Sequence, residues 1–451
     1  IVYNGEIYNT DILRKELKRA GWQFGSKSDT EVILLLFLQY GPEFVKKIDG
    51  IFSFAIYDSS HAILYLYRDQ FGIKPLFYTF VKEDNAIVFG SEVKALFEYG
   101  KIDAVVDRDG LNEVFGVGPA RQPGNAVFKG INELKPGNYL TCSKYGVISK
   151  EYWRLESRYH EDSYERTIEK TKYLLEDAVV RQMVSDDEVP ICTFLSGGID
   201  SSLVSSICAA KLKEEGKRLS TYSFDFTGNE KYFKANSFQP SQDAPYAKKM
   251  VDYLGTEHKI LNCDYEIQAN LLYESIDSHD LPCMADIDSS LIFFCREVSK
   301  KHKVVLTGEC ADEIFGGYPW FHREKFLKCN TFPWTPDLSP RKQLMKPDVL
   351  EVLNMDEYVK KAYESAVKEV DILPWENKIE ADRRRISYLN IRFFMQTLLN
   401  RMDRTSMHSG LEARVPFADK QLVQYVFNIP WDMKARNDMV KNVLRQAASG
   451  R

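Results

Sequence analysis

The sequence predicts a protein of two domains: a strand-rich α+β domain, then an α/β domain with a parallel sheet. Its 451 residues exceed the roughly 250 to 300 at which a single hydrophobic core stops growing. Short apolar runs dominate about the first third of the chain, and strand patterns alternate with helical patterns after it. Apolar residues make up 44% of the chain, which is typical of a globular protein.

The first predicted domain spans residues 1–155 and consists mostly of strands. Its predicted elements are helices at 10–20 and 30–40 and strands at 51–57, 63–67, 76–80 and 86–89. A Lys-Pro-Gly turn at 135–137 and the pair Tyr152-Trp153 mark the end of this strand-rich part. We therefore predict a domain boundary near residue 155.

The second predicted domain spans residues 156–451 and alternates strands with helices. Its predicted elements are helices at 162–183, 201–212, 244–254 and 289–300, and strands at 189–195, 219–226 and 303–306. Strand, helix, strand in succession predicts a parallel sheet, because parallel neighbours need a crossover connection. From residue 358 onward the pattern predicts helices packed at the end of this domain.

Composition excludes several classes of protein. A net charge of −5 argues against a general affinity for nucleic acid or an anionic membrane. The longest purely apolar run, Val32 to Leu38, is far shorter than the ~20 residues that span a bilayer, so we expect a cytoplasmic protein. The eight cysteines form no CxxC pair or Cys/His ladder, which predicts neither a disulfide scaffold nor a zinc site.

A glycine-rich turn, Ser196 to Ser202, joins an apolar strand to a helix. Its backbone N–H groups and the positive end of the helix favour a phosphate or pyrophosphate, and Gly197 and Gly198 let the anion come close. It is not a Walker loop, because no lysine follows the glycines. The alternative is a plain helix-capping turn.

An acidic turn, Thr307 to Gly317, follows a second strand of the same predicted sheet. Loops at the carboxyl ends of parallel strands meet in one crevice, so this turn should face the glycine-rich turn. Asp200 and Asp312 could then share a magnesium ion, which prefers carboxylate and phosphate oxygens. The alternative is a structural turn held by capping bonds and ion pairs.

These two turns resemble the pyrophosphate loop of ATP pyrophosphatases and the second signature of asparagine synthetases. The resemblance runs the length of the chain. It is carried further by Asn4 to Asn9, Ser28 to Glu31, Arg68 to Leu76, Gly90 to Glu92, Leu411 to Asp419 and Lys441 to Arg445.

For the first domain, the resemblance implies a class II glutamine amidotransferase with the layered αββα fold of N-terminal-nucleophile hydrolases. Asn4 and the Gly5 amide would form the oxyanion hole, and Glu6 and Asp29 would hold the α-amino group of glutamine. No cysteine precedes Cys142, so we expect the nucleophile upstream of Ile1 and the N-terminal part of this domain to be missing here. Without the resemblance, Asn4-Gly5 is typical of a hairpin turn.

For the second domain, the resemblance implies a parallel-sheet ATP-pyrophosphatase fold, similar to adenine nucleotide alpha hydrolases, with C-terminal helices. Its chemistry would be a ligase reaction: ATP and Mg²⁺ activate the β-carboxylate of aspartate as an acyl-adenylate, and ammonia from glutamine then displaces AMP. Lys441 and Glu309 would be catalytic. The residues expected to bind ATP or its pyrophosphate are Phe194, Ser196, Gly197, Gly198, Asp200, Ser201, Phe224, Thr307 and Gly308.

Several questions stay open. Arg404 and Arg414 match family positions, but a structural and a substrate-binding role are equally compatible with the sequence. The resemblance implies a homodimer with glutamine, aspartate and ATP as substrates. The alternatives are a relative that amidates or cyclises another carboxylate, and a non-catalytic scaffold. Intact Asn4, Gly5, Glu6 and Asp29 favour ammonia transfer over cyclisation, and intact Asp200, Asp312 and Lys441 argue against the scaffold.

Overall fold

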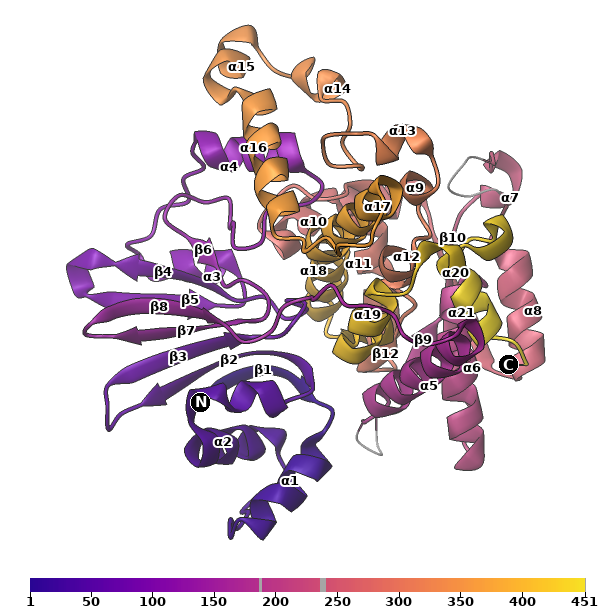
Figure 1. The fold of residues 1–451 in the computed structure, drawn as a ribbon, viewed down its shortest axis with the longest axis horizontal. Helices are drawn as coiled ribbons and strands as arrows, with labels where there is room; N and C mark the ends of the chain where they lie inside the picture. Colours follow the sequence, from indigo (N-terminus) through magenta and orange to yellow (C-terminus); the bar gives the residue numbers. More distant parts are fainter. Residues whose placement is uncertain (186–188, 236–240, 451) are drawn as a thin grey trace. The chain divides into compact units, whose positions relative to one another are not determined.

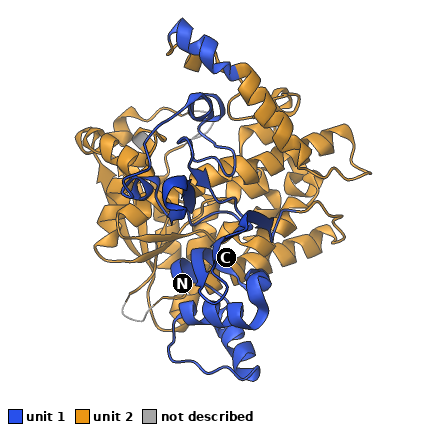
Figure 2. Cartoon of the chain, turned by 90° about the vertical axis from the view of Figure 1, so that its left-hand side faces the viewer, with its two compact units in different colours: residues 1–155, 346–355 blue, residues 156–345, 356–451 orange. Residues whose placement is uncertain are grey.

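The computed structural model describes residues 1–185, 189–235 and 241–450, which divide into two compact units (Figures 1 and 2). Unit 1 contains residues 1–155 together with 346–355, and unit 2 contains the remainder. The chain thus has two units, one strand-rich and one built on a parallel sheet, which confirms the predicted two-domain α+β and α/β architecture.

Unit 1 is built around an antiparallel sheet with the strand order β1-β2-β3-β7-β8 among its described residues. The strands are β1 (Val2–Ile7), β2 (Gly50–Asp58), β3 (Ile63–Arg68), β7 (Asn138–Ser143) and β8 (Gly146–Glu151). A smaller antiparallel sheet has the order β5-β4-β6, from β4 (Phe77–Val81), β5 (Ala86–Gly90) and β6 (Asn132–Glu133). The predicted strands at 51–57, 63–67, 76–80 and 86–89 correspond to β2, β3, β4 and β5.

Alternation along β2 explains how the layers of unit 1 pack. Phe52 and Phe54 lie in a buried cluster with residues of α1 (Thr10–Arg19) and α2 (Asp29–Tyr40), so these helices cover one face of the larger sheet (Figure 1). Ala55 points the other way, into a cluster with Tyr78 and Phe89 of the smaller sheet. The helix α3 (Val93–Phe97) then packs beside Phe77 of that smaller sheet.

The interpretation of Asn4-Gly5 as a hairpin turn is wrong. Both residues lie inside β1, where Gly5 pairs with Phe52 of β2. Gly5 has a φ of +147°, and a Cβ there would lie 2.1 Å from the carbonyl oxygen of Ile51. The glycine is therefore required by close strand pairing, and not by a change in chain direction.

The segment after β3 is held by two buried charged side chains. Arg68 pairs with Glu133 at 2.9 Å and donates to the carbonyl oxygens of Gly72 and Leu134. Asp69 accepts hydrogen bonds from backbone N–H groups, including that of Lys74 at 3.0 Å. Arg68 and Asp69 thus stabilise a loop inside unit 1. Buried charged groups require ion-pair or hydrogen-bond partners, and the loop backbone supplies them.

Unit 2 contains a parallel sheet with the order β11-β10-β9-β12-β13 in the described part of the chain, as predicted. Its strands are β9 (Cys192–Phe194), β10 (Ser220–Phe226), β11 (Glu257–Cys263), β12 (Val304–Leu306) and β13 (Glu412–Arg414). The strands β9 and β12 are neighbours although about 110 residues separate them. From β9 the chain moves outward to β10, and β12 lies on the other side, so the strand order reverses at β9.

Helices cover both faces of this sheet. Cys192 and Phe194 of β9 face a cluster with α11 (Asp286–Ser299) and α18 (Met395–His408), whereas Thr193 bonds Ser205 of α6 at 2.7 Å. The predicted helices are confirmed with small shifts at their ends. They are α1, α2, α5 (Tyr164–Gln182), α6 (Ile199–Glu214), α8 (Ala244–Leu254) and α11.

The C-terminal part of unit 2 is mainly helical, as predicted. Its longer helices are α16 (Met355–Lys368), α17 (Lys378–Leu389), α18, α19 (Lys420–Phe427) and α21 (Asn442–Ala447). Among the described residues, no helix is both long and apolar enough to cross a membrane.

Candidate active site

The glycine-rich turn connects the end of β9 to the start of α6. Ser196 and Ser201 hold it together, since the Ser196 N–H donates to Oγ of Ser201 at 3.1 Å and the two hydroxyl oxygens are 3.0 Å apart. Gly198 is the N-cap of α6, and no side chain caps it. The first turn of a 16-residue helix therefore presents backbone N–H groups to the turn, an arrangement that attracts anions.

Two glycines allow close backbone approach at this point. Gly197 has a φ of +84°, and a Cβ there would lie 2.3 Å from the backbone nitrogen of Ala247. A Cβ on Gly308 would lie 2.7 Å from the backbone nitrogen of Ser201, and Thr307 and Gly308 directly follow β12. The acidic turn is thus seated against the start of α6, so the two turns meet as parallel strand geometry predicts.

Asp200, Asp312 and Lys441 form an ionic triad between these turns. Nζ of Lys441 lies 2.6 Å from Oδ2 of Asp200 and 2.7 Å from Oδ1 of Asp312. Asp200 is in the first turn of α6, Asp312 is in α12 (Ala311–Phe315), and Lys441 directly precedes α21. The fold therefore gathers three charged groups from distant parts of the sequence around one point.

The backbone fixes the position of Lys441. The residue has a φ of +55°, in the left-handed region, and serves as the N-cap of α21. It is almost completely buried, at 6% exposure. A Cβ on Gly317 would lie 2.5 Å from Cε of Lys441 and would also overlap Asp312, so a glycine is needed to leave room for the ion pair.

Burial and charge oppose each other in this triad. Burial raises the pKa of Asp200, the Lys441 ammonium opposes this rise and Asp312 adds to it, with a net pKa of about 6. Burial alone would lower the pKa of Lys441, but the two carboxylates raise it, so the ammonium stays charged. Among the described residues, the buried Oδ1 of Asp200 has no hydrogen-bond partner. An oxygen in that state is suited to a cation.

Aromatic rings lie at the end of β9 and within β10. Phe194 and Phe224 contact each other with ring centroids 4.7 Å apart, and Phe224 stacks on Phe294 of α11 at 4.2 Å. The sequence indicated Phe194 and Phe224 but not Phe294. Its position in the middle of an amphipathic helix gave no sign that it supports this aromatic group.

Glu309 lies in the acidic turn and pairs with Arg401 of α18 at 3.1 Å. Both side chains are partly exposed. Glu313 of α12 is fully buried and accepts a hydrogen bond from the Tyr318 hydroxyl at 2.6 Å. The sequence analysis assigned no role to these three residues, although Glu313 and Tyr318 lie in or beside the acidic turn and Arg401 is three residues from Arg404.

Arg404 and Arg414, whose roles the sequence left open, are both buried in structural contacts. Arg404 pairs with Asp280 at 2.7 Å and donates to the carbonyl oxygen of Ser278. Arg414 pairs with Glu412 at 2.7 Å and donates to the carbonyl oxygen of Gln182. These bonds attach α18 and β13 to neighbouring elements, which favours the structural interpretation.

In unit 1, the fold brings Asp29 to the end of β1. The carboxylate of Asp29 accepts hydrogen bonds from the Tyr3 hydroxyl at 2.8 Å and the Ile7 N–H at 3.3 Å. The Asn4 side chain donates to Oγ of Ser91 at 3.4 Å. Glu6 lies on the same strand, so the four predicted residues Asn4, Gly5, Glu6 and Asp29 lie on or beside β1.

The family model described as asparagine synthase matches residues 170–451, and the one described as glutamine amidotransferase domain matches residues 1–153. The first match covers more than half of the chain and includes every member of the ionic triad. The chain belongs to the asparagine synthase family.

Three known proteins align with all or nearly all of the chain. Asparagine synthetase [glutamine-hydrolyzing] 3 of Bacillus subtilis strain 168 is 47% identical over 451 residues, covering 100% of this chain and 72% of its own length. Asparagine synthetase [glutamine-hydrolyzing] 1 of the same organism is 29% identical over 483 residues, covering 100% and 73%. The amidase chyE of Penicillium rubens is 27% identical over 496 residues, covering 96% and 71%.

Proposed function

We propose that this asparagine synthase family member is a ligase that makes asparagine from aspartate, ATP and the amide nitrogen of glutamine. In the first step, a β-carboxylate oxygen of aspartate attacks the α-phosphorus of ATP, and pyrophosphate leaves. In the second step, ammonia attacks the acyl carbon of β-aspartyl-AMP, and the bond to the AMP oxygen breaks. The products are asparagine, AMP, pyrophosphate and glutamate.

The observation that supports this proposal most strongly is the ionic triad beside the glycine-rich turn. Backbone N–H groups of Gly197 and Gly198, at the positive end of α6, are suited to the departing pyrophosphate. The charged ammonium of Lys441 lies between the carboxylates of Asp200 and Asp312, and Asp200 is in the first turn of that helix. Its role is to stabilise negative charge that develops on the α-phosphate and the acyl centre.

Asp200 and Asp312 fit a magnesium ion. The unsatisfied Oδ1 of Asp200 and the nearby Asp312 carboxylate are hard oxygen ligands, which magnesium prefers. When bound, the ion supplies positive charge that offsets the charge of the phosphates. The Lys441 ammonium by itself offsets only one of the two carboxylate charges.

Glu309 is proposed to act near the acyl centre, together with its partner Arg401. Arg401 orients the carboxylate through a charge-assisted hydrogen bond of 3.1 Å. The adenine base is proposed to bind against Phe194, Phe224 and the backbone at Thr307 and Gly308. An apolar slot beside backbone amides is what a purine requires.

Residues 1–155 are proposed to be the glutaminase domain and residues 156–451 the synthetase domain. Asn4 and the Gly5 amide would stabilise the tetrahedral intermediate of glutamine hydrolysis, while Glu6 and Asp29 bind the α-amino group. The helix, sheet, sheet, helix packing of unit 1 supports the layered αββα fold of N-terminal-nucleophile hydrolases. We also propose that the protein is a homodimer. Its molar mass, measured by light scattering after size-exclusion chromatography, would test this.

A second candidate function keeps the ATP chemistry and changes the carboxylate. It is supported by the 27% identical protein of Penicillium rubens, which is named an amidase and not an asparagine synthetase. Selectivity for the acceptor depends on loop geometry, which the family match leaves open.

The experiment that separates these functions measures pyrophosphate and AMP with ATP, Mg²⁺, ammonium chloride and one carboxylate at a time. Ammonium chloride supplies the nitrogen directly, so the synthetase reaction is tested apart from glutamine hydrolysis. Asparagine synthesis predicts pyrophosphate only when aspartate is present. Pyrophosphate with another carboxylate, and none with aspartate, would favour the second candidate.

A further inference from the structure

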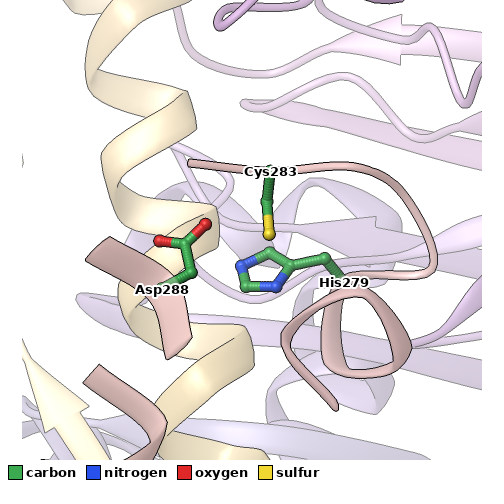
Figure 3. A group of neighbouring side chains, drawn as sticks. All are labelled: His279, Cys283 and Asp288. Atoms are coloured by element: carbon green, nitrogen blue, oxygen red, sulfur yellow. The ribbon is translucent and has the colours of Figure 1, made fainter. Parts of the chain in front are cut away.

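We propose that His279, Cys283 and Asp288 form a binding site for a zinc ion in unit 2. His279 ends α10 (Leu272–His279), Asp288 is in the first turn of α11, and Cys283 lies between the two helices. One potential ligand atom from each residue lies within 4.8 Å of the other two. Figure 3 shows the three side chains pointing toward one another.

The hydrogen bonds of His279 prepare its Nε2 to bind a metal. Nδ1 lies 2.8 Å from the carbonyl oxygen of Ser275, and a carbonyl oxygen only accepts hydrogen bonds. Nδ1 must therefore carry the proton of the neutral ring, so the lone pair is on Nε2. An imidazole whose other N–H donates to a backbone carbonyl is the arrangement found around metal-binding histidines.

The buried carboxylate of Asp288 is a second, independent indication of a cation site. Its side chain is fully buried, at 0% exposure. Oδ2 accepts a hydrogen bond from the Met284 N–H at 2.6 Å, but within the described residues Oδ1 has no hydrogen-bond partner. The hydrogen bond from the Met284 N–H therefore satisfies only Oδ2. A buried carboxylate oxygen without a donor is costly unless a cation binds it.

Cys283 is available to bind a metal because its thiol forms no disulfide. All eight cysteines lie in the described part of the chain and are free thiols. The sulfur of Cys283 lies 3.7 Å from the carbonyl oxygen of Ser275, the same oxygen that accepts a hydrogen bond from Nδ1 of His279. A metal ion would displace the thiol proton and bind the thiolate.

The ligand types point to zinc. One imidazole nitrogen, one thiolate and one carboxylate are ligands that Zn²⁺ accepts together, whereas magnesium and calcium prefer oxygen alone. A thiolate and a carboxylate also carry the two negative charges that balance Zn²⁺. Water would complete a tetrahedral site, since the cluster contributes three protein ligands. The sequence gave no sign of it because the spacing of 279, 283 and 288 matches no zinc motif.

The proposed ion would fix the segment between α10 and α11 from both sides. That segment contains Met284, whose sulfur lies 3.4 Å from Nη1 of Arg401. Arg401 in turn holds Glu309. The site is separate from the Asp200 and Asp312 pair, and its expected effect is to stabilise the segment behind Glu309. It is independent of the proposed function, because zinc binding needs neither ATP nor aspartate.

The test begins with purified protein stripped of metal by a chelator and titrated with zinc chloride. We expect one tightly bound zinc ion per chain and a rise in the melting temperature. Cobalt chloride should give the near-ultraviolet absorption band of a cobalt–thiolate bond. Cys283→Ser should abolish that band. His279→Gln and Asp288→Asn should each weaken zinc binding by more than about a hundredfold, because loss of a ligand costs more than loss of a residue that only supports a ligand.

The matched control is Cys329→Ser, which removes another partly buried free cysteine and should leave the band and the zinc affinity unchanged. Alkylation of the unaltered protein gives a second readout that does not depend on variants folding. Zinc should protect Cys283, but not Cys329, from iodoacetamide, as mapped by mass spectrometry. No cobalt–thiolate band, or equal alkylation of Cys283 with and without zinc, would overturn the proposal.

Discussion

Gly308→Ala should separate the two turns that the proposed ATP site requires. The new Cβ would lie 2.7 Å from the backbone nitrogen of Ser201 and 2.9 Å from the carbonyl carbon of Asp200. Both are backbone atoms, so no side-chain rotation relieves the overlap. Overpacking of this kind costs about 1–3 kcal/mol of stability. The start of α6 must retreat by roughly 0.5–1 Å, and a displacement of ~1 Å at a reacting centre costs about a hundredfold in rate.

The assay is asparagine formation from aspartate and ammonium chloride at a series of ATP concentrations. We expect kcat/KM for ATP to fall about a hundredfold, while the protein stays folded. Gly25→Ala is the matched control, because the nearest atom to its new Cβ would be a side-chain oxygen of Glu31 at 3.8 Å. If Gly308→Ala and Gly25→Ala have equal kinetics, close approach of the two turns is not needed for catalysis.

Three further changes test other parts of the account. Lys441→Met should lower the rate of pyrophosphate formation by about 10²–10³ without unfolding the protein, because it removes the ammonium between Asp200 and Asp312; a near-normal rate would contradict its catalytic role. Arg68→Met should lower the free energy of unfolding by about 3–5 kcal/mol in urea titrations, because it leaves Glu133 buried without its cation. Lys434→Met should stabilise the protein most at or below pH 7 and progressively less toward pH 10, as measured by melting temperature. Burial, reinforced by Arg384, lowers the pKa of Lys434 to about 7, so the folded state disfavours the charged lysine. This unfavourable contribution to stability is complete below pH 7. It decreases as the pH rises toward 10.5, the ordinary pKa of lysine. A gain independent of pH would refute this reasoning.

The sequence predicted the elements whose apolar patterns are strong. The strands β9, β10 and β12 are short apolar runs between polar turns, and their parallel pairing follows from the helices between them. It missed β11 and β13, because β11 begins with three charged or polar residues and has no regular alternation, and β13 has only three residues, two of them charged. It also gave no sign that residues 346–355 belong with unit 1.

Local preferences misled where tertiary contacts decide the conformation. Asn-Gly favours a turn, but pairing of Gly5 with Phe52 keeps these residues in a strand. Convergence of the glycine-rich and acidic turns was predictable, since loops after parallel strands share one edge of the sheet. The contacts of Lys441 were not, because the lysine is 241 residues from Asp200 and its left-handed backbone conformation has no sequence signature.

In the proposed reaction, a carboxylate oxygen of aspartate attacks the α-phosphorus of ATP at the ionic triad. Aspartate labelled with ¹⁸O in its β-carboxylate tests it most directly, with ATP, Mg²⁺ and ammonium chloride as the other substrates. One labelled oxygen should then appear in the phosphate of AMP, as detected by mass spectrometry. Label in inorganic phosphate with ADP as the product, or unlabelled AMP, would contradict it.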